Sequence, residues 1–242
     1  MPEPKGPGSK TGKSPRDLFE QAKKEFSRPV PQAYRPLIAI DKGDGIKIGK
    51  ELFTRRIFKN ISGGTGFSYM DLFHYVLPDN APEHDPKQEI RKLVASLIKG
   101  RDFIDLGSGY DERGDTIGFE TAKKFGARRY IGVDLQVQET FRNESIPQVF
   151  FKSEVLEFIS KVSDPRKDTP SKFIAISGLD PDFPSAPQAD QYFKAFSDEL
   201  RRITKKGDVV YIGPFSEVLE DILELKKIGF VRGREHLWTQ NS

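Results

Sequence analysis

Short polar segments follow several predicted strands, and their residue types could bind a ligand that contains a ribose. Gly107 and Gly109 come directly after the apolar run DFIDL, which ends on Asp105-Leu106, while Asp134 closes the next run, RYIGV. Glycines let the backbone turn tightly and approach a ligand without interference from a Cβ atom. A carboxylate at the end of a second strand can accept hydrogen bonds from the two hydroxyls of a ribose. Asp134 could instead cap a helix, and that alternative stays open.

A second carboxylate and a proline-stiffened loop follow the next two strands. Glu154 comes after QVFFK and could accept a hydrogen bond from an exocyclic amine, or it could simply favour the N-terminus of the next helix by its charge. Ser177 closes KFIAIS, and Asp180-Pro181-Asp182-Phe183 follows it. Asp180 and Asp182 are the best candidates for a catalytic base or for orienting an acceptor amine. The alternative is a proline-rich loop with a negative rim.

The glycine spacings do not match two common phosphate-binding motifs. The dinucleotide motif G-x-G-x-x-G opens directly into a helix, whereas here Gly109 is followed by YDERG, which places Gly114 two positions late. The segment GPGSKTGKSP resembles a P-loop at its end, but Pro7 stands where the first glycine belongs. The five residues before it, two of them proline, do not read as the buried strand that a P-loop follows. We therefore disfavour an NAD(P) oxidoreductase and a P-loop nucleotide-binding protein.

The elements that position these residues alternate along the chain. Periodicity predicts strands at 102–106, 129–135, 148–152, 172–177 and 208–213, helices at 85–100, 116–126, 155–162, 191–203 and 216–229, and an extended end at 230–238. Alternation of this kind predicts an α/β fold with a doubly wound, mostly parallel sheet and helices on both faces. Such sheets bind ligands at the carboxyl ends of their strands, where the polar segments fall.

The first quarter of the chain differs in charge from the rest. Residues 1–60 carry 14 Lys and Arg against 7 Asp and Glu, a net charge of +7, whereas the remainder carries 25 against 29, a net charge of −4. We expect a flexible basic tail with a short amphipathic helix over 1–28, an extension or lid that packs on the core over 29–84, and the α/β domain over 85–242. The basic arm could bind nucleic acid, or it could be a solvated tail that only aids solubility.

The aromatic stretch GFSYMDLFHY (66–75) is a second feature of the extension. Tyr69 and His74 could line a substrate pocket together with Phe183, or the aromatic side chains of this stretch could pack a helix on the sheet. The three histidines of the chain do not show the spacing of metal ligands, so we expect no metal site.

Composition excludes several further classes. The chain has no cysteine, which excludes disulfides, Cys–zinc sites and thiol nucleophiles and is consistent with a cytoplasmic protein. No apolar run approaches the ~18 residues of a membrane span, so we expect no membrane partner. The start of the sequence lacks the apolar region of a signal peptide.

In the order of these motifs the chain resembles the class I SAM-dependent methyltransferase family. The resemblance covers about residues 85–230 and lies in FIDLGSGY (103–110), YIGVDL (130–135), FFKSEVLEF (150–158) and YFKAFSDELRRITKKGDVVYIG (192–213). It implies that the glycine loop contacts the methionine part of S-adenosylmethionine, that the acid after the second strand binds the ribose, and that the acid after the third contacts the adenine. The cofactor-binding positions it implies are Asp105, Gly107, Ser108, Gly109, Tyr110, Asp134, Leu135, Glu154, Val155 and Ser177.

Several positions depart from the family pattern. YDERGD lengthens the stretch between Asp105 and Asp134, Glu154 stands where Asp is commoner, and the chain after the last helix is short for the usual antiparallel hairpin. Asp182 replaces the second proline of the [DNS]-P-P-[FY] motif of amine methyltransferases. We predict a SAM-dependent methyltransferase that acts on an unidentified small molecule or nucleic acid. The alternative is a non-catalytic binding or scaffold protein that works through its basic N-terminal arm.

Overall fold

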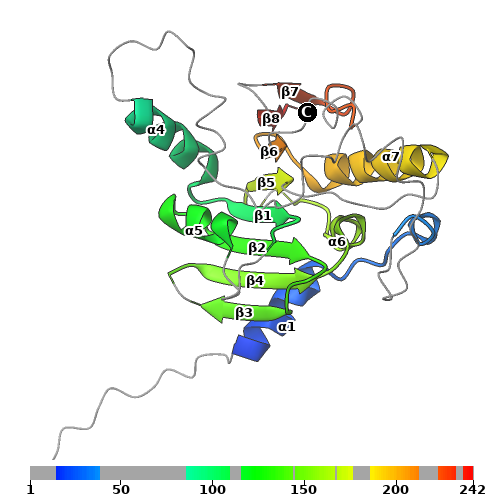
Figure 1. Cartoon of the computed structure of the whole chain (residues 1–242), viewed down its shortest axis with the longest axis horizontal. Helices are drawn as coiled ribbons and strands as arrows, with labels where there is room; N and C mark the ends of the chain where they lie inside the picture. Colours follow the sequence, from blue (N-terminus) through cyan, green and yellow to red (C-terminus); the bar gives the residue numbers. More distant parts are fainter. Residues whose placement is uncertain are drawn as a thin grey trace, which may run out of the picture.

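The computed structural model describes residues 15–38, 86–109, 116–143, 145–166, 168–176, 186–212, 223–232 and 237–241, which form an α/β structure (Figure 1). The helices are α1 (Pro15–Glu25), the short 3-10 helix η1 (Gln32–Tyr34), α4 (Pro86–Ile98), α5 (Ile117–Lys124), α6 (Val155–Lys161) and α7 (Ala186–Ile203). The strands are β1 (Asp102–Leu106), β2 (Arg129–Asp134), β3 (Thr140–Asn143), β4 (Pro147–Lys152), β5 (Lys172–Ile176), β6 (Val209–Ile212), β7 (Phe230–Arg232) and β8 (Leu237–Gln240).

The eight strands form one mixed sheet in the order β3-β4-β2-β1-β5-β6-β8-β7, and Figure 1 shows them stacked in this order from β3 at the bottom to β7 at the top. Strands β4, β2, β1, β5 and β6 are mutually parallel, whereas β3 pairs with β4, and β8 with both β6 and β7, in antiparallel fashion. The chain builds outward from β1 through β2 to β4, and then returns to the other side of β1 to build β5 and β6. The direction of strand order therefore reverses between β1 and β5.

Each face of the sheet carries its own hydrophobic cluster, because successive strand side chains point to opposite faces. In β1, Ile104 and Leu106 join one cluster, and Phe103 joins the other. The Ile104 cluster also contains side chains of α1, α6 and α7, whereas the Phe103 cluster contains side chains of α4 and α5. Both faces of the central strands are therefore covered by helices.

Helix α1 is part of the first cluster. Its apolar side chains recur at helical spacing, and Phe19, Ala22 and Phe26 are buried. The ring of Phe26 lies 4.9 Å from that of Phe151 and 5.1 Å from that of Phe158, measured between centroids. The helix predicted within the N-terminal segment is thus confirmed, and it packs on the sheet.

Most of the elements predicted downstream of residue 85 are confirmed to within a few residues. Helix α7 begins at Ala186, five residues earlier than predicted, and the extended end is an antiparallel hairpin whose first strand, β7, has three residues. Strand β3 was not predicted. The prediction of a helix over 216–229 is wrong for its described part, because residues 223–229 form turns.

Other predictions lie outside the described residues, namely the tail over 1–14 and most of the extension over 29–84. Among the residues that the structure does describe, no helix combines the length and the apolar character needed to cross a bilayer.

Gly132 in the middle of β2 offers a test of the packing between the sheet and its second cluster. A Cβ atom at this position would lie 2.6 Å from the ring carbons Cδ1 and Cε1 of Phe150 on the neighbouring strand. We therefore expect Gly132→Ala to lower the free energy of unfolding by about 1–3 kcal/mol, as overpacking does, measured by urea denaturation. In a Phe150→Leu background the same substitution should cost clearly less, since the ring that it strikes is gone; equal costs in both backgrounds would contradict this packing.

Candidate functional site

The glycine loop after β1 is bonded across to the end of β2. The N–H groups of Gly107 and Ser108 both donate to the carbonyl of Val133, at 2.9 and 3.1 Å, and the N–H of Gly109 donates to Oδ2 of Asp134 at 3.0 Å. Gly107 and Gly109 have φ angles of 73° and 58°, in the left-handed region that glycine enters at little cost. Gly107 and Gly109 therefore allow the loop to fold back onto the neighbouring strand.

This bonding decides what the loop can offer to a ligand. A loop that cradles a phosphate does so with free backbone N–H groups, usually at the start of a helix. Here the three consecutive N–H groups of residues 107–109 already have acceptors inside the protein. Helix α5 begins only at Ile117. The described part of the loop therefore presents glycine Cα atoms and carbonyl oxygens, which suit a ligand without a phosphate at this point.

Asp134 lies at the carboxyl end of β2, beside the reversal of strand order. Its carboxylate is half-buried and accepts from the N–H of Gly109 through Oδ2 and from the N–H of Gln136 through Oδ1, at 2.9 Å. A carboxylate has roughly four acceptor positions, so about two remain for a ligand. The next side chain, Leu135, is 42% exposed and is one of two large apolar side chains exposed in the described residues. Asp134 and Leu135 thus place a positioned acceptor beside an apolar surface.

Asp105, also predicted to bind a cofactor, is fully buried one residue before the end of β1. Its Oδ2 accepts from the hydroxyl of Tyr130 at 2.9 Å, and that hydroxyl accepts from the hydroxyl of Thr116 at 2.7 Å. Thr116 caps α5 by accepting from the N–H of Phe119 at 3.0 Å. Burial raises the pKa of Tyr130 well above its ordinary value, so its hydroxyl stays a donor. The carboxylate of Asp105 is thereby connected to the start of α5.

Glu154 begins α6, and its two oxygens have protein partners. Oε2 accepts from the N–H of Glu157 at 2.8 Å, which makes Glu154 the N-cap of α6, and Oε1 accepts from the hydroxyl of Tyr192 on α7. Burial raises the pKa of Glu154 above its ordinary value, despite these hydrogen bonds. The structure thus gives Glu154 the helix-capping role weighed as the alternative. Val155, beside it, is buried.

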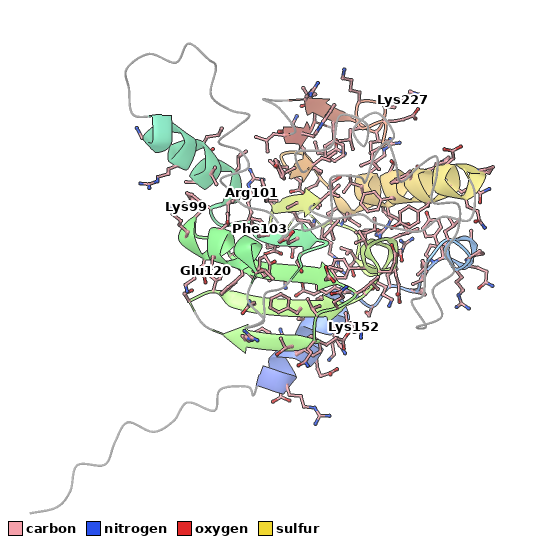
Figure 2. All side chains as sticks on the ribbon, in the orientation of Figure 1. Lys99, Arg101, Phe103, Glu120, Lys152 and Lys227 are labelled. Carbon is pink, nitrogen blue, oxygen red and sulfur yellow. The ribbon has the colours of Figure 1, made fainter. Side chains whose placement is uncertain are left out.

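Figure 2 shows where these groups lie in the sheet as a whole: Lys152 marks the carboxyl end of β4, and Arg101 precedes the start of β1 at the opposite edge. Gly107–Gly109, Leu135 and Glu154 follow the ends of β1, β2 and β4, and Asp134 is the last residue of β2. The remaining predicted residues lie outside the described ranges. They are Tyr110 and Ser177 for the cofactor, Asp180 and Asp182 for catalysis, and Tyr69, His74 and Phe183 for the substrate.

Sequence reasoning missed the side chains that support the site. Tyr130 and Thr116 were assigned only to a strand and to a helix start. In the parallel pairing of β1 with β2, however, Asp105 lies opposite Gly132, two residues from Tyr130 and therefore on the same face of the sheet. The alternation of β1 and β2 could have predicted that both face α5. Tyr192 was read only as a core residue of its helix. In the described ranges, no group of three or more His, Cys, Asp or Glu side chains could hold a metal ion.

Comparison with known proteins does not assign the chain to a family. A scan against models of known protein families gives no match, and a search of curated proteins gives no significant match either.

The hydrogen-bond chain through Tyr130 predicts a stability effect. Tyr130→Phe removes the hydroxyl that joins Thr116 to Asp105 and leaves the buried carboxylate with one donor fewer. We expect the free energy of unfolding to fall by about 1–3 kcal/mol, the usual cost of an unmet buried hydrogen bond, in urea denaturation at neutral pH. A loss within error of zero would show that this hydroxyl does not support Asp105.

Glu154 predicts a pH dependence. Its pKa is raised in the folded state above the ordinary value of 4.5, so the folded protein binds this proton more tightly than the unfolded chain does. The contribution of Glu154 to stability is therefore fully present below pH 4.5 and is lost as the pH rises through the raised pKa. Each unit of upward shift corresponds to about 1.4 kcal/mol.

Glu154→Gln stays neutral and should not show this loss. The stability of this variant relative to wild type, measured by urea denaturation from pH 4 to pH 8, is expected to rise with pH across that window. Glu120→Gln, at an exposed position of α5 where the side chain is 62% accessible, is the matched control. The same rise in the control, or a flat difference for Glu154→Gln, would contradict the assignment.

Proposed function

We propose that this chain is a class I SAM-dependent methyltransferase that transfers a methyl group to an acceptor that is a small molecule or a nucleic acid. The observation that carries the proposal is the bonding of the glycine loop to β2. It leaves no free N–H at residues 107–109 for a pyrophosphate, while it brings the loop against the carboxylate of Asp134. A dinucleotide needs free N–H groups for its pyrophosphate, whereas S-adenosylmethionine has no phosphate and can use the carboxylate for its ribose.

The sheet supports the same proposal. Numbered in chain order, the five parallel strands run 3-2-1-4-5, which is the order found in doubly wound nucleotide-binding folds. Helices α4 and α5 pack on one face of the sheet, and α6 and α7 pack on the opposite face together with α1. The reversal of strand order between β1 and β5 is where such folds bind their ligands. The antiparallel β7–β8 hairpin agrees with the hairpin that the resemblance implies, with β7 shortened.

The residues at this reversal fit the cofactor. The carboxylate of Asp134 retains acceptor capacity for the two ribose hydroxyls, and exposed Leu135 can cover one face of the adenine or ribose. The glycines at 107 and 109 permit close approach of the methionine part. Glu154 is committed to α6 and to Tyr192, so we propose that it shapes the adenine end of the site through the start of α6.

When bound, S-adenosylmethionine supplies a methyl group activated by its sulfonium. The protein then has to place the acceptor in line with that group, and a general base is needed only if the acceptor must lose a proton first. We propose Asp180 and Asp182 for orienting or deprotonating the acceptor, with Tyr69, His74 and Phe183 forming its pocket. Ser177 and Tyr110 complete the proposed cofactor contacts.

Cofactor binding is tested by the melting temperature of the full chain with S-adenosylhomocysteine, SAM, NAD and ATP, each added separately. A ligand at roughly a hundred times its dissociation constant stabilises the native state by about 2.7 kcal/mol, which gives a clear shift. We expect shifts with SAM and S-adenosylhomocysteine alone. They should vanish in Asp134→Ala and persist in Glu120→Ala, which removes an exposed carboxylate of α5.

Other outcomes would redirect the proposal. A shift with NAD or ATP but not with SAM would contradict it. No shift with any of the four would favour the non-catalytic alternative, in which the chain binds a partner through its basic N-terminal arm.

A further inference from the structure

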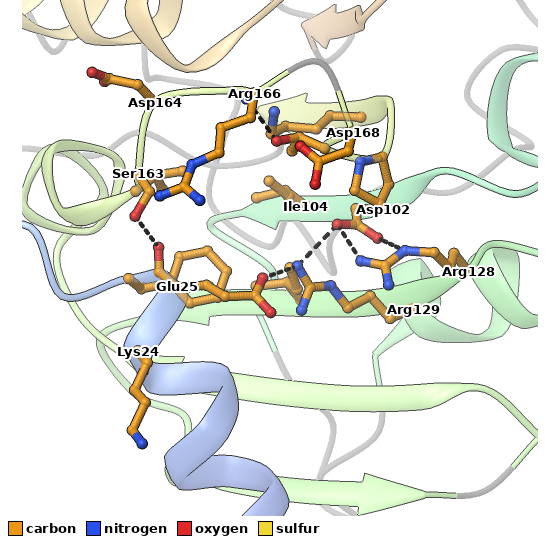
Figure 3. A pocket seen from close by; sticks show the side chains of 16 residues that line it. Lys24, Glu25, Asp102, Ile104, Arg128, Arg129, Ser163, Asp164, Arg166 and Asp168 are labelled. Atoms are coloured by element: carbon orange, nitrogen blue, oxygen red, sulfur yellow. Dashed lines mark hydrogen bonds and ion pairs between the residues drawn. The ribbon is translucent and has the colours of Figure 1, made fainter.

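A cavity of about 510 Å³ opens at the amino ends of β1, β2 and β5, at the opposite edge of the sheet from the glycine loop. Its walls come from three distant parts of the chain: residues 24–26 at the end of α1, the starts of the three strands, and the segment between α6 and β5 (Figure 3). Cavities of this size accommodate small molecules. Nothing in the proposed methyl transfer uses this one.

The inner wall of the cavity carries a fixed set of ion pairs. Asp102 accepts from Nε and Nη2 of Arg128, at 2.6 and 2.7 Å, and from Nη2 of Arg129 at 2.9 Å. Nη2 of Arg129 also donates to Glu25 on α1 at 2.5 Å. The two arginines and two carboxylates neutralise one another and hold the guanidinium groups in place. Arg128 is 44% exposed in its side chain and binds Asp102 through Nε and Nη2. Within the part of the chain that the structure describes, the N–H groups of its Nη1 are left for a ligand.

Arg166 lies on the opposite wall and differs from these arginines. Among the residues that the structure describes, no carboxylate lies within 4.0 Å of its guanidinium, and its side chain is exposed. Figure 3 shows this side chain extending from its loop toward the end of α1, over the cavity. Asp164, which also lines the cavity, is bound instead by Arg202, and Arg202 is not part of the lining. With respect to the described residues, Arg166 thus offers a guanidinium without a carboxylate partner to the space that Arg128 and Arg129 face.

The charges of the lining sum to a small positive value. The lining has five cationic side chains and four acidic ones, a net charge of +1. They are Lys24, Arg128, Arg129, Arg166 and Lys172 against Glu25, Asp102, Asp164 and Asp168. The ammonium group of Lys172 already has protein partners, since its Nζ donates to the carbonyl of Ile203 at 2.9 Å and lies 3.6 Å from Oδ2 of Asp208. The net positive charge of the lining favours a ligand that carries a negative charge.

We infer that this cavity binds a small molecule through one oxyanion group, a carboxylate or a phosphate, held between Arg166 and the guanidinium of Arg128. The planar fork of a guanidinium matches both groups in geometry. Such a ligand would connect the loop before β5 to the strand starts and, through Arg129 and Glu25, to α1. The site is separate from the proposed cofactor crevice and does not depend on it.

The test is calorimetric titration of the full chain with sodium acetate and, separately, with inorganic phosphate, at constant ionic strength. We expect saturable binding of at least one of them, which identifies the oxyanion. Arg166→Gln should weaken it about tenfold or more, since it removes a charge-assisted contact. Asp168→Asn, which removes a negative charge from the rim, should leave binding unchanged or tighten it.

Two controls keep the result specific. Lys194→Gln removes one positive charge from the exposed face of α7, where the Lys194 side chain is 77% accessible, and should bind the anion as wild type does. Asp134→Ala should also bind it unchanged, which separates this cavity from the cofactor crevice. Absence of saturable binding of both anions, equal affinity of Arg166→Gln and wild type, or equal weakening by Lys194→Gln would overturn the inference.

Discussion

Strand β1 pairs with β2 along its whole length, from Asp102 opposite Arg129 to Leu106 opposite Val133, and polar contacts close this pairing at both ends. At the carboxyl end the glycine loop donates to the carbonyl of Val133 and to the carboxylate of Asp134. At the amino end Asp102 is held by Arg128, which precedes β2, and by Arg129, its first residue. Both candidate sites depend on this pairing, because it fixes the backbone from which their side chains project.

The two ends differ in what they offer to a ligand. At the carboxyl end the backbone donors are used internally, and a carboxylate and an apolar side chain remain available, which suits a nucleoside. At the amino end the carboxylates of Asp102 and Glu25 are used internally, and within the described residues guanidinium N–H groups remain available, which suits an anion. The same strands therefore present opposite chemistry at their two edges. At each edge, the groups left for a ligand are those that have no hydrogen-bond partner among the described residues.

Much of the fold was predictable from local patterns. Strands β1, β2, β4 and β5 are short apolar runs that end in polar or glycine residues, and Gly100 and Gly126 end helical segments with positive φ angles of 71°. The edge strand β3 was missed because TFRN has neither an apolar run nor alternation; it forms by pairing with β4. Tertiary pairing of this kind is not encoded in the segment itself.

The candidate site was predictable in position but only partly in role. The rule that ligands bind at the carboxyl ends of parallel strands placed Asp134 and the glycines correctly at one edge. It could not show that Glu154 binds Tyr192, since that contact joins residues 38 positions apart. Nor could it predict the amino-edge cavity, which needs α1, the strand starts and the loop before β5 to meet.

The central claim is that the crevice between the glycine loop and Asp134 binds the adenosyl cofactor. The most direct measurement is a crystal structure of the full chain grown with saturating S-adenosylhomocysteine. The account predicts the ligand beside Gly107 and Gly109, with both ribose hydroxyls within hydrogen-bond reach of the Asp134 carboxylate and the adenine against Leu135. A crevice without ligand under these conditions, or S-adenosylhomocysteine bound elsewhere on the protein, would contradict it.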